Sequence, residues 1–131
     1  MARVIDTNVF SYFLKEDTRA DLYLPHITNQ FLIVSFMTVA EIEVWALRAN
    51  WGIKRNAKFE KTLRRYFVQG ASRQVYRLWA KVIDEGRKSG ANIEQADAWI
   101  AATALYFNIP LVTHNRTDFQ SVNGLQVISE Q

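Results

Sequence analysis

Short apolar runs that alternate with longer helical stretches restrict the fold of this chain more than any other feature. The run Phe31 to Val34 is continuously apolar, as expected of a strand that is covered on both faces. With similar runs it gives four predicted strands, at residues 3–5, 31–34, 111–113 and 125–128. The residues between them show helical spacing, at 9–15, 19–29, 38–50, 53–69, 73–89 and 92–108. This alternation predicts an α/β fold with a parallel sheet and helices on both of its faces.

The length of the chain and the expected topology together indicate where a functional site would form. A chain of 131 residues can bury an ordinary core, so we expect a single domain over residues 1–131. Each helix that connects two parallel strands runs opposite to them, so strand ends and helix starts share one edge of the sheet. Ligands of such sheets bind along that edge. Functional side chains are therefore expected at strand ends and helix starts.

Asp97 is the side chain that the helical pattern explains least. It falls on the apolar stripe of the predicted helix 92–108, which consists of Ile93, Ile100, Ala104 and Phe107. Asn92 is expected to cap this helix, with Gln95 reaching back to it as in a capping box. A carboxylate that faces a core is costly unless a cation or hydrogen-bond donors meet it. Asp97 therefore requires a partner, either an Arg or Lys side chain or a bound cation.

Three further acids map to the same edge of the sheet, and each has a structural explanation of its own. Asp6 follows the first strand and is equally suited to cap the next helix. Glu41 follows the second strand and completes the capping-box pattern Thr38-x-x-Glu41, which favours a structural role when taken alone. Asp118 follows the strand 111–113 and suits a turn. Taken singly, none of these three acids demonstrates a functional site.

The four acids together favour a metal site. Carboxylates from four distant segments repel each other at short range, and divalent cations cancel that repulsion. The chain has no cysteine for a thiolate zinc site, a disulfide framework or a Cys nucleophile, and oxygen-only ligands favour Mg²⁺ or Mn²⁺. Such ions activate water and steady the leaving oxygen of a phosphodiester. The pattern predicts metal-dependent phosphodiester hydrolysis by Asp6, Glu41, Asp97 and Asp118.

Basic residues are concentrated between Arg48 and Lys81. Ten bases and one acid, Glu60, give this segment a charge of +9, whereas the rest of the chain carries −6 within a total of +3. A basic surface beside an acidic site suits a polyanion such as single-stranded RNA. The residues predicted to contact RNA are Lys54, Arg55, Lys58, Lys61, Arg64 and Arg65. The alternative is a pair of amphipathic helices whose aromatic residues are core and whose charges are merely solvated.

Four motifs carry a resemblance to a known family. They are VIDTN at 4–8, SFMTVAE at 35–41, DAWIAATA at 97–104 and LVTHNRTDF at 111–119. In this order, over nearly the whole chain, they resemble the PIN-domain ribonucleases of the small kind that act as VapC-type toxins of toxin–antitoxin pairs. The resemblance implies a Rossmann-like, three-layer α/β/α sandwich with a central parallel sheet. It also implies a metal-dependent endoribonuclease whose Mg²⁺ or Mn²⁺ ligands are Asp6, Glu41, Asp97 and Asp118.

The same resemblance implies supporting residues and partners. Thr113 and Asn115 match the family's polar positions beside the last acid and are expected to hold Asp118 or a metal-bound water. Thr7 and Asn8 are expected to do the same for Asp6. A small VapB-type antitoxin would cover the acid pocket, and the basic segment would contact the antitoxin or form a homodimer if it does not bind RNA. The implied cleavage of RNA leaves a 5′-phosphate.

Two alternatives remain open on the sequence alone. One is Mg²⁺-dependent phosphotransfer on Asp6, although an aspartyl phosphatase has a second Asp where Asn8 stands, and a receiver has a late Lys whereas none follows Lys88. The other is a non-catalytic RNA-binding module. No P-loop pattern is present, which argues against nucleotide hydrolysis of that kind. Without a signal-peptide pattern or an apolar run near ~20 residues, the chain is expected to be cytoplasmic and free of membrane contact.

Overall fold

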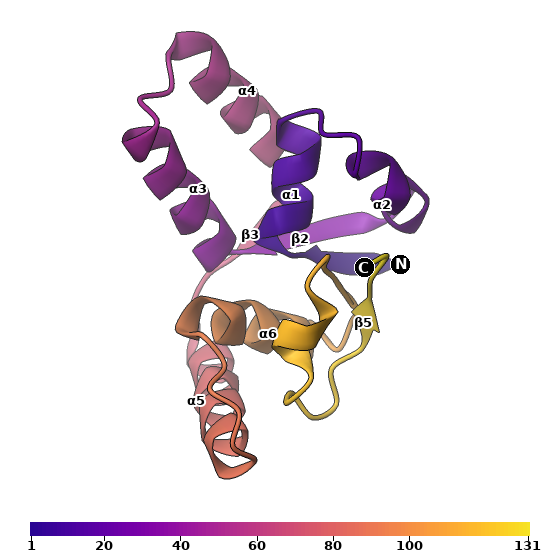
Figure 1. The fold of residues 1–131 in the computed structure, drawn as a ribbon, viewed down its shortest axis with the longest axis vertical. Helices are drawn as coiled ribbons and strands as arrows, with labels where there is room; N and C mark the ends of the chain where they lie inside the picture. Colours follow the sequence, from indigo (N-terminus) through magenta and orange to yellow (C-terminus); the bar gives the residue numbers. More distant parts are fainter.

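A five-stranded sheet separates two layers of helices in the computed structural model, which describes residues 1–131 (Figure 1). The strands are β1 (Ala2–Ile5), β2 (Phe31–Ser35), β3 (Phe67–Gln69), β4 (Leu111–Val112) and β5 (Val127–Ile128). All pairs are parallel, and the strands lie in the order β3-β2-β1-β4-β5. The predicted α/β/α sandwich with a central parallel sheet is confirmed.

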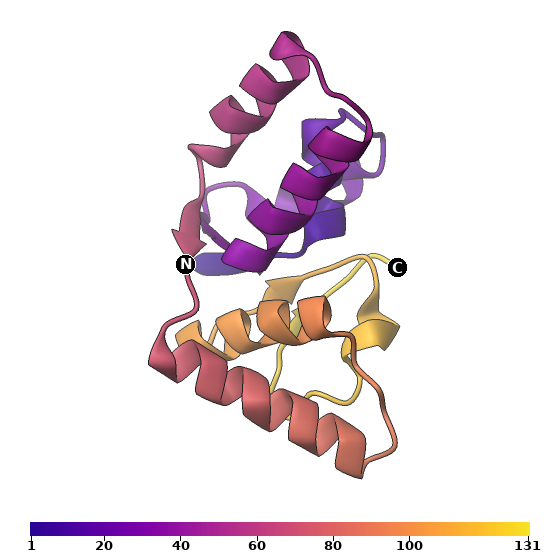
Figure 2. The same ribbon diagram turned by 90° about the vertical axis from the view of Figure 1, so that its left-hand side faces the viewer.

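Four helices cover one face of the sheet, and the remaining helices cover the other (Figures 1 and 2). The first layer holds α1 (Thr7–Leu14), α2 (Ala20–Ile27), α3 (Phe36–Arg48) and α4 (Ile53–Leu63). The second layer holds α5 (Arg73–Lys88), α6 (Gln95–Phe107) and the short 3₁₀ helix η1 (Arg116–Phe119). Alternate strand residues supply the two cores, with Ile5 and Val34 in one and Val4 and Ile33 in the other. None of these helices has the length and apolar character that crossing a bilayer demands.

The predicted helix 53–69 is wrong in its second half. The helix α4 ends at Leu63, and the chain turns there through a hydrogen bond from the Tyr66 N–H to the Leu63 carbonyl at 3.0 Å. Phe67 and Val68 then pair with β2 as the edge strand β3. Aromatic and β-branched residues suit a strand, and the open edge of β2 offers them a full set of hydrogen-bond partners, which outweighs continuation of the helix.

The predicted helix start at Asn92 is also wrong. The helix α6 begins at Gln95, and its N-cap residue is Glu94, whose carbonyl accepts the N–H of Ala98 at 2.9 Å. This helix packs between the sheet and α5. It is therefore buried on most sides, and the single apolar stripe predicted from the sequence is replaced by a run of buried small residues around Ile100. Asn92 itself is exposed.

The carboxyl ends of β1 and β4 meet where the strand order reverses. The chain leaves β1 for β2 on one side and later returns to β4 on the other side. The N–H of Asp6 donates to the carbonyl of Val112 at 2.9 Å, so the two strand ends are joined directly. A parallel sheet opens a crevice at such a reversal, and ligands bind there. The predicted acidic residues are found around this crevice.

Candidate active site

Asp6 is the buried centre of the site, with 4% of its surface exposed. Its Oδ1 accepts the backbone N–H of Thr7 at 2.7 Å, and its Oδ2 accepts the Thr113 hydroxyl at 2.6 Å. Asp6 is also the N-cap residue of α1, so the capping role considered from the sequence is real and coexists with its place in the site. Burial raises the pKa of Asp6 to about 6, with a further contribution from the charges of Glu41 and Asp118, while the hydrogen bonds oppose the shift.

Two buried threonines orient Glu41. The Thr7 hydroxyl donates to Glu41 Oε1 at 2.7 Å and lies 2.9 Å from the Thr38 hydroxyl. Because a hydroxyl carries one proton, the donation to Glu41 leaves the Thr7 hydroxyl only its acceptor side for Thr38. Thr38 must therefore donate to Thr7. The result is a directed chain of hydrogen bonds from α3 through α1 and back to α3.

The predicted capping box of Thr38 and Glu41 is wrong. The helix α3 begins at Phe36, and Ser35 caps it by accepting the N–H of Met37 at 3.0 Å. Thr38 lies inside the helix, is fully buried and has the Thr7 hydroxyl as its partner. The sequence signal for this role was a threonine one turn before the acid, on the same helix face, within an otherwise apolar turn.

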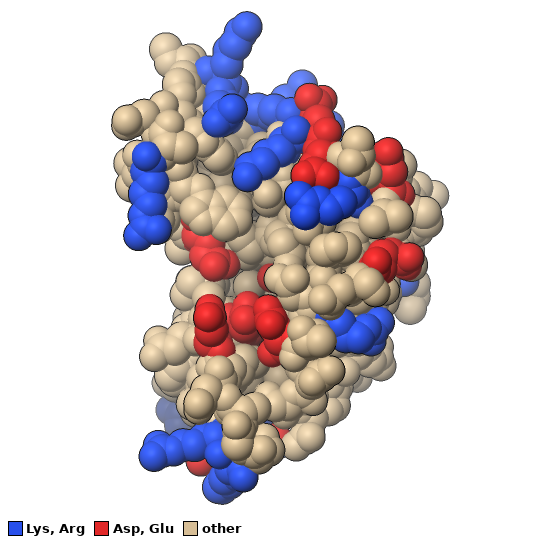
Figure 3. All heavy atoms as spheres, in the orientation of Figure 1, with Lys and Arg blue, Asp and Glu red and all other residues tan.

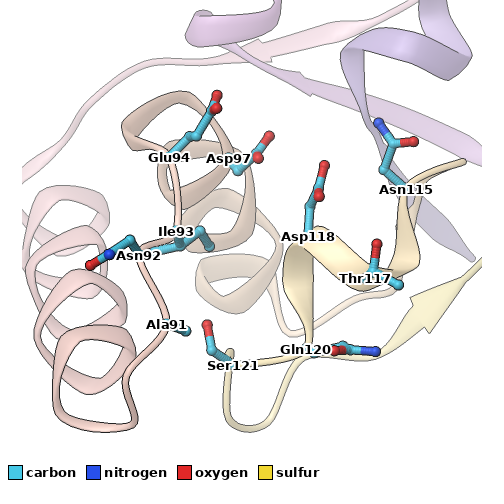
Figure 4. Close-up of a pocket in the computed structure, with 10 residues that line it drawn as sticks. All are labelled: Ala91, Asn92, Ile93, Glu94, Asp97, Asn115, Thr117, Asp118, Gln120 and Ser121. Atoms are coloured by element: carbon cyan, nitrogen blue, oxygen red, sulfur yellow. The ribbon is translucent and has the colours of Figure 1, made fainter.

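Three more acids surround an open pocket beside Asp6 (Figure 4). The side chains of Glu94 and Asp97, at the start of α6, and of Asp118, in η1, point toward the same space. Asp97 also lines a second hollow together with Asp6 and Glu41, so the two hollows adjoin. Burial, and after it the charges of the neighbouring carboxylates, led by Asp6, together raise the pKa of Asp97 to about 7. All four predicted acids, with Glu94 as a fifth, therefore meet at one edge of the sheet.

No positive side chain lies among these acids. Neither of the adjoining hollows has a Lys or Arg in its lining, and no ion pair of the protein involves the four predicted acids. Figure 3 shows red acidic side chains gathered in the notch between the two helical layers, whereas most of the blue Lys and Arg side chains lie above and below it and one blue patch lies to its right. Pairing of Asp97 with a protein cation, the alternative considered from the sequence, does not occur.

The supporting residues lie at the site, but their contacts differ from those predicted. Thr113 is fully buried and donates to Asp6, whereas it was expected to hold Asp118 or a metal-bound water. The backbone N–H of Asn115 donates to the Thr113 hydroxyl oxygen at 3.0 Å, and the Asn115 side chain faces the pocket (Figure 4). Thr7 meets Asp6 through its backbone and Glu41 through its side chain. The contact with Asp118 that the resemblance implied does not form, because the parallel pairing of β4 with β1 places Thr113 beside Asp6.

A buried tyrosine, missed by sequence reasoning, fastens the loop after β4. Tyr23 on α2 is fully buried, and its hydroxyl donates to the Thr113 carbonyl at 3.3 Å and accepts the Glu130 N–H at 3.0 Å. The same hydroxyl contacts Nδ1 of His114. On the other side of the loop, Asn8 Oδ1 accepts the His114 N–H at 3.3 Å. These contacts fix the segment that carries Thr113, and no local pattern in the sequence signals them.

Comparison with known proteins agrees with this arrangement. Residues 3–125 match the family model of the PIN domain. The chain is 30% identical over 131 residues to ribonuclease VapC1 of Haemophilus influenzae (strain R2866), and the match covers 96% of each protein. The chain belongs to the PIN-domain family. Within this family its similarity is to VapC proteins, because the VapC ribonuclease Y4jK of Sinorhizobium fredii is also 30% identical over 96% of the chain and 95% of that protein.

Solved structures show the same PIN fold. The structure of VapBC-1 from nontypeable Haemophilus influenzae matches with a TM-score of 0.84 at 29% identity, and 98% of each chain is covered. The structure of VapBC2 from Rickettsia felis, bound to a DNA fragment from their promoter, matches with a TM-score of 0.85 at 21% identity over 98% of each chain. The second match concerns the fold alone. The predicted PIN-like sandwich is thus confirmed.

The acidic edge of this PIN domain carries the donors that a hard divalent cation prefers. All of them are oxygens, and no thiolate or paired imidazole is present. A bound cation would offset the cost of burying negative charge and the repulsion between carboxylates, which are the two causes of the raised pKa values of Asp6 and Asp97. As the side chains stand, no three His, Cys, Asp or Glu residues are arranged to hold one ion. Mg²⁺ and Mn²⁺ usually bind through one or two carboxylates and keep several waters, so the oxygens of this edge suit such an ion without a closed protein cage.

The basic segment of the PIN domain does not form one surface. The residues of α4 and those of α5 lie on opposite faces of the sheet (Figures 1 and 2). Of the residues predicted to contact RNA, five line two adjoining hollows along α4, namely Lys54, Arg55, Lys58, Lys61 and Arg65. Arg64 is exposed but lines neither hollow. The charge of +9 read from the sequence is therefore divided between two separate faces, and the aromatic Phe59 is core, as the alternative reading expected.

Proposed function

We propose that this PIN domain is a metal-dependent endoribonuclease and the toxin of a toxin–antitoxin pair. The observation that carries the proposal is the convergence of four carboxylates, free of any protein cation, around the buried Asp6 at the reversal of the strand order. Such a cluster is electrostatically unfavourable unless a cation joins it. The relatives of this chain include proteins named ribonuclease VapC, which supports this reaction class.

In this proposal the ligands are Asp6, Glu41, Asp97 and Asp118. When bound, Mg²⁺ or Mn²⁺ supplies an activated water and neutralises charge on the scissile phosphate. The protein contributes a fixed arrangement of oxygens, because Thr7 and Thr113 hold both oxygens of Asp6 and the threonine chain from Thr38 holds Glu41. The absence of Lys and Arg from the hollows leaves the acids free to take up a cation. The products are RNA fragments with a 5′-phosphate and a 3′-hydroxyl.

An antitoxin and a second copy of the chain complete the proposed assembly. The VapBC-1 structure from Haemophilus influenzae and a toxin–antitoxin complex from Klebsiella pneumoniae, with a TM-score of 0.78, share the fold of this chain. By analogy we place a VapB-type protein over the acid pocket and expect a homodimer in the cytoplasm. Copurification of a small protein that suppresses RNA cleavage would support this part of the proposal.

Phosphotransfer is the weaker alternative on this geometry. Both oxygens of Asp6 already accept hydrogen bonds from buried donors, and the residue is 4% exposed, so it is poorly placed to attack a phosphoryl group. Incubation with acetyl phosphate followed by intact-mass measurement tests this alternative. A stable adduct on Asp6 would support it and would count against the nuclease.

Cleavage of RNA with mapped ends tests the proposal directly. Wild-type protein is incubated with total RNA in Mg²⁺, in Mn²⁺ or in EDTA, and the products are captured by ligation, which requires a 5′-phosphate. We expect cleavage in either metal and none in EDTA. The variants Asp6→Asn and Asp97→Asn should be inactive, whereas Asp84→Asn, an exposed residue of α5 that pairs with Lys88, should retain activity. Activity retained by Asp97→Asn, or cleavage in EDTA, would contradict the assignment.

A further inference from the structure

The helix α4 presents a row of cations along one side. Lys54, Lys58, Lys61 and Arg65 are spaced at i, i+4, i+7 and i+11, the last of them just beyond the end of the helix. At a rise of 1.5 Å per residue the row is about 16 Å long. The buried anchor of the helix is Phe59, whose ring packs against Phe10 with centroids 6.2 Å apart. The cations therefore face outward along a helix that is fixed to the body by its other side.

This row is almost unpaired within the protein. Its only ion pair joins Lys58 to Glu16, at 3.3 Å and largely exposed to solvent. Lys54, Lys61 and Arg65 have no acidic partner. Like charges one turn apart destabilise a helix, so a row of this kind is unfavourable for the isolated protein. An external anion is the partner that would compensate it.

The cations line a groove between α1 and α4. One hollow of the groove contains Lys15 from the end of α1 together with Trp51, Lys54 and Lys58. The next hollow shares Lys54 and Lys58 and continues to Arg65. The groove thus combines a line of positive charge with the half-buried indole ring of Trp51, and the Arg55 guanidinium lies over this ring, 5.5 Å from its centroid.

Lys15 and Trp45 connect this groove to the acid pocket. The Nζ of Lys15 lies 5.4 Å from the centroid of the Trp45 ring. Trp45 stands one turn after Glu41 on α3 and lines the same hollow as Asp6 and Asp97. The half-buried indole of Trp45 therefore lies between the basic groove and the acids. A chain of phosphates that leaves the acid pocket on this side meets Trp45 first and the basic row next.

We propose that the α1–α4 groove binds the single-stranded RNA that flanks the cleaved bond, with cations on its phosphates and a base stacked on Trp45. The inference rests on the proposed nuclease function and specifies where its substrate lies. Cations that follow a backbone and aromatic rings that accept bases are the two elements of sequence-tolerant single-strand binding. An acidic peptide would satisfy the charges of the groove, but it would not use the indole rings of Trp45 and Trp51 near Lys15.

The salt dependence of RNA binding tests the groove. The probe is a fluorescein-labelled uridine 12-mer, and binding is measured by anisotropy between low and moderate salt in the Asp97→Asn background with Mg²⁺. Each phosphate contact contributes about 0.7 to the slope of log K against log salt for a single strand. The triple variant Lys54→Gln, Lys58→Gln, Lys61→Gln should therefore lower the slope by about two and weaken binding at low salt.

A charge-matched variant on the other helical layer is the control. Arg73, Arg77 and Lys81 form an exposed row at i, i+4 and i+8 of α5, on the opposite face of the sheet. Their replacement by Gln removes the same three charges and should leave the slope unchanged. Equal losses in the two variants would show a non-specific effect of net charge and would overturn the proposal. Unchanged RNA binding with loss of polyglutamate binding in the α4 variant would also overturn it, in favour of an acidic peptide.

Substitution of the indole separates stacking from charge. Loss of one base–aromatic contact lowers affinity by about tenfold, so Trp45→Leu should bind the 12-mer about tenfold more weakly at an unchanged salt slope. Trp45→Phe keeps a ring and should recover most of the affinity. Equal affinities of these two variants would refute the stacking. Since all these measurements report binding alone, they remain decisive even when the wild-type protein fails to cleave RNA, an outcome that would refute the nuclease but not the groove.

Discussion

Neutralising Asp6 should stabilise the metal-free protein while it abolishes the proposed activity. The pKa of Asp6 rises from 3.8 to about 6 on folding, chiefly because of burial. The folded protein therefore holds this proton more tightly than the unfolded chain. The stability contributed by Asp6 is complete below pH 4 and is lost as the pH rises through 6. In Asp6→Asn no such loss occurs, so the variant should gain over wild type across this range of pH.

The expected gain follows from the shift and the local hydrogen bonds. A rise of about two pKa units corresponds to about 3 kcal/mol of stability lost by wild type above pH 6. The Asn amide can still accept the Thr7 N–H, but its NH₂ group faces the Thr113 hydroxyl, which then loses its acceptor at a cost of about 1 kcal/mol. The net gain is about 2 kcal/mol, or about 6 °C in the midpoint of thermal unfolding for a chain of this size.

Urea unfolding in EDTA at pH 4.5 and pH 7.5 measures the difference. Asp6→Asn should exceed wild type by about 2 kcal/mol at pH 7.5 and show little gain at pH 4.5. Asp21→Asn, an exposed acid in the first turn of α2, is the matched control and should change the stability by about 0.5 kcal/mol or less at both pH values. A variant no more stable than wild type at pH 7.5, or a gain that is independent of pH, would refute this account of the buried charge.

Three further predictions concern the ion, the threonine chain and the helix α4. Mg²⁺ should raise the midpoint of thermal unfolding more at pH 7.5 than at pH 5, because protons compete with the ion for Asp6 and Asp97 below their raised pKa values. Each competing proton weakens the binding free energy of the ion by about 1.4 kcal/mol per pH unit. An equal shift of the midpoint at both pH values would contradict this competition. Thr38→Val should lower RNA cleavage by about tenfold through misorientation of Glu41, whereas Thr38→Ser keeps the hydroxyl donor and should keep the activity. Equal activities of the two variants would show that the hydrogen bonds from Thr38 through Thr7 to Glu41 have no role in cleavage. Phe59→Ala should lower the free energy of unfolding in urea by about 3–5 kcal/mol, because the buried ring packs α4 against Phe10 and Trp51. A smaller loss would mean that other contacts hold this helix.

The sequence was sufficient for the layered fold because the apolar runs and the helical spacing agree over most of the chain. It also placed Asp6, Glu41, Asp97 and Asp118 at one edge, because parallel topology brings strand ends together whatever the detail of the loops. The structure bears out their proximity, while their role as metal ligands stays a prediction. The strand β3 was missed because residues 53–69 continue a helical charge pattern, and only pairing with the edge of β2 breaks it.

The finer contacts of the site depended on tertiary geometry that local patterns do not contain. The Thr38–Thr7–Glu41 chain joins two helices, and a capping box in the sequence is indistinguishable from it. The family resemblance assigned Thr113 to Asp118 or a metal-bound water, whereas strand pairing places it beside Asp6, more than one hundred positions away. The basic segment looked like one surface because sequence distance carries no information about which side of the sheet a helix covers.

The hydrogen bond from Thr113 to Asp6 joins the residue after the first strand, β1, to the residue after the fourth, β4, near the other end of the chain. During synthesis, a growing polypeptide that has made β1, α1 and α3 holds Asp6 and Glu41 but lacks the opposite wall, which arrives only with α6, β4 and η1. Prematurely terminated products are therefore harmless under the proposed function, and a cell that makes this protein meets its activity only once translation of nearly the whole message has succeeded.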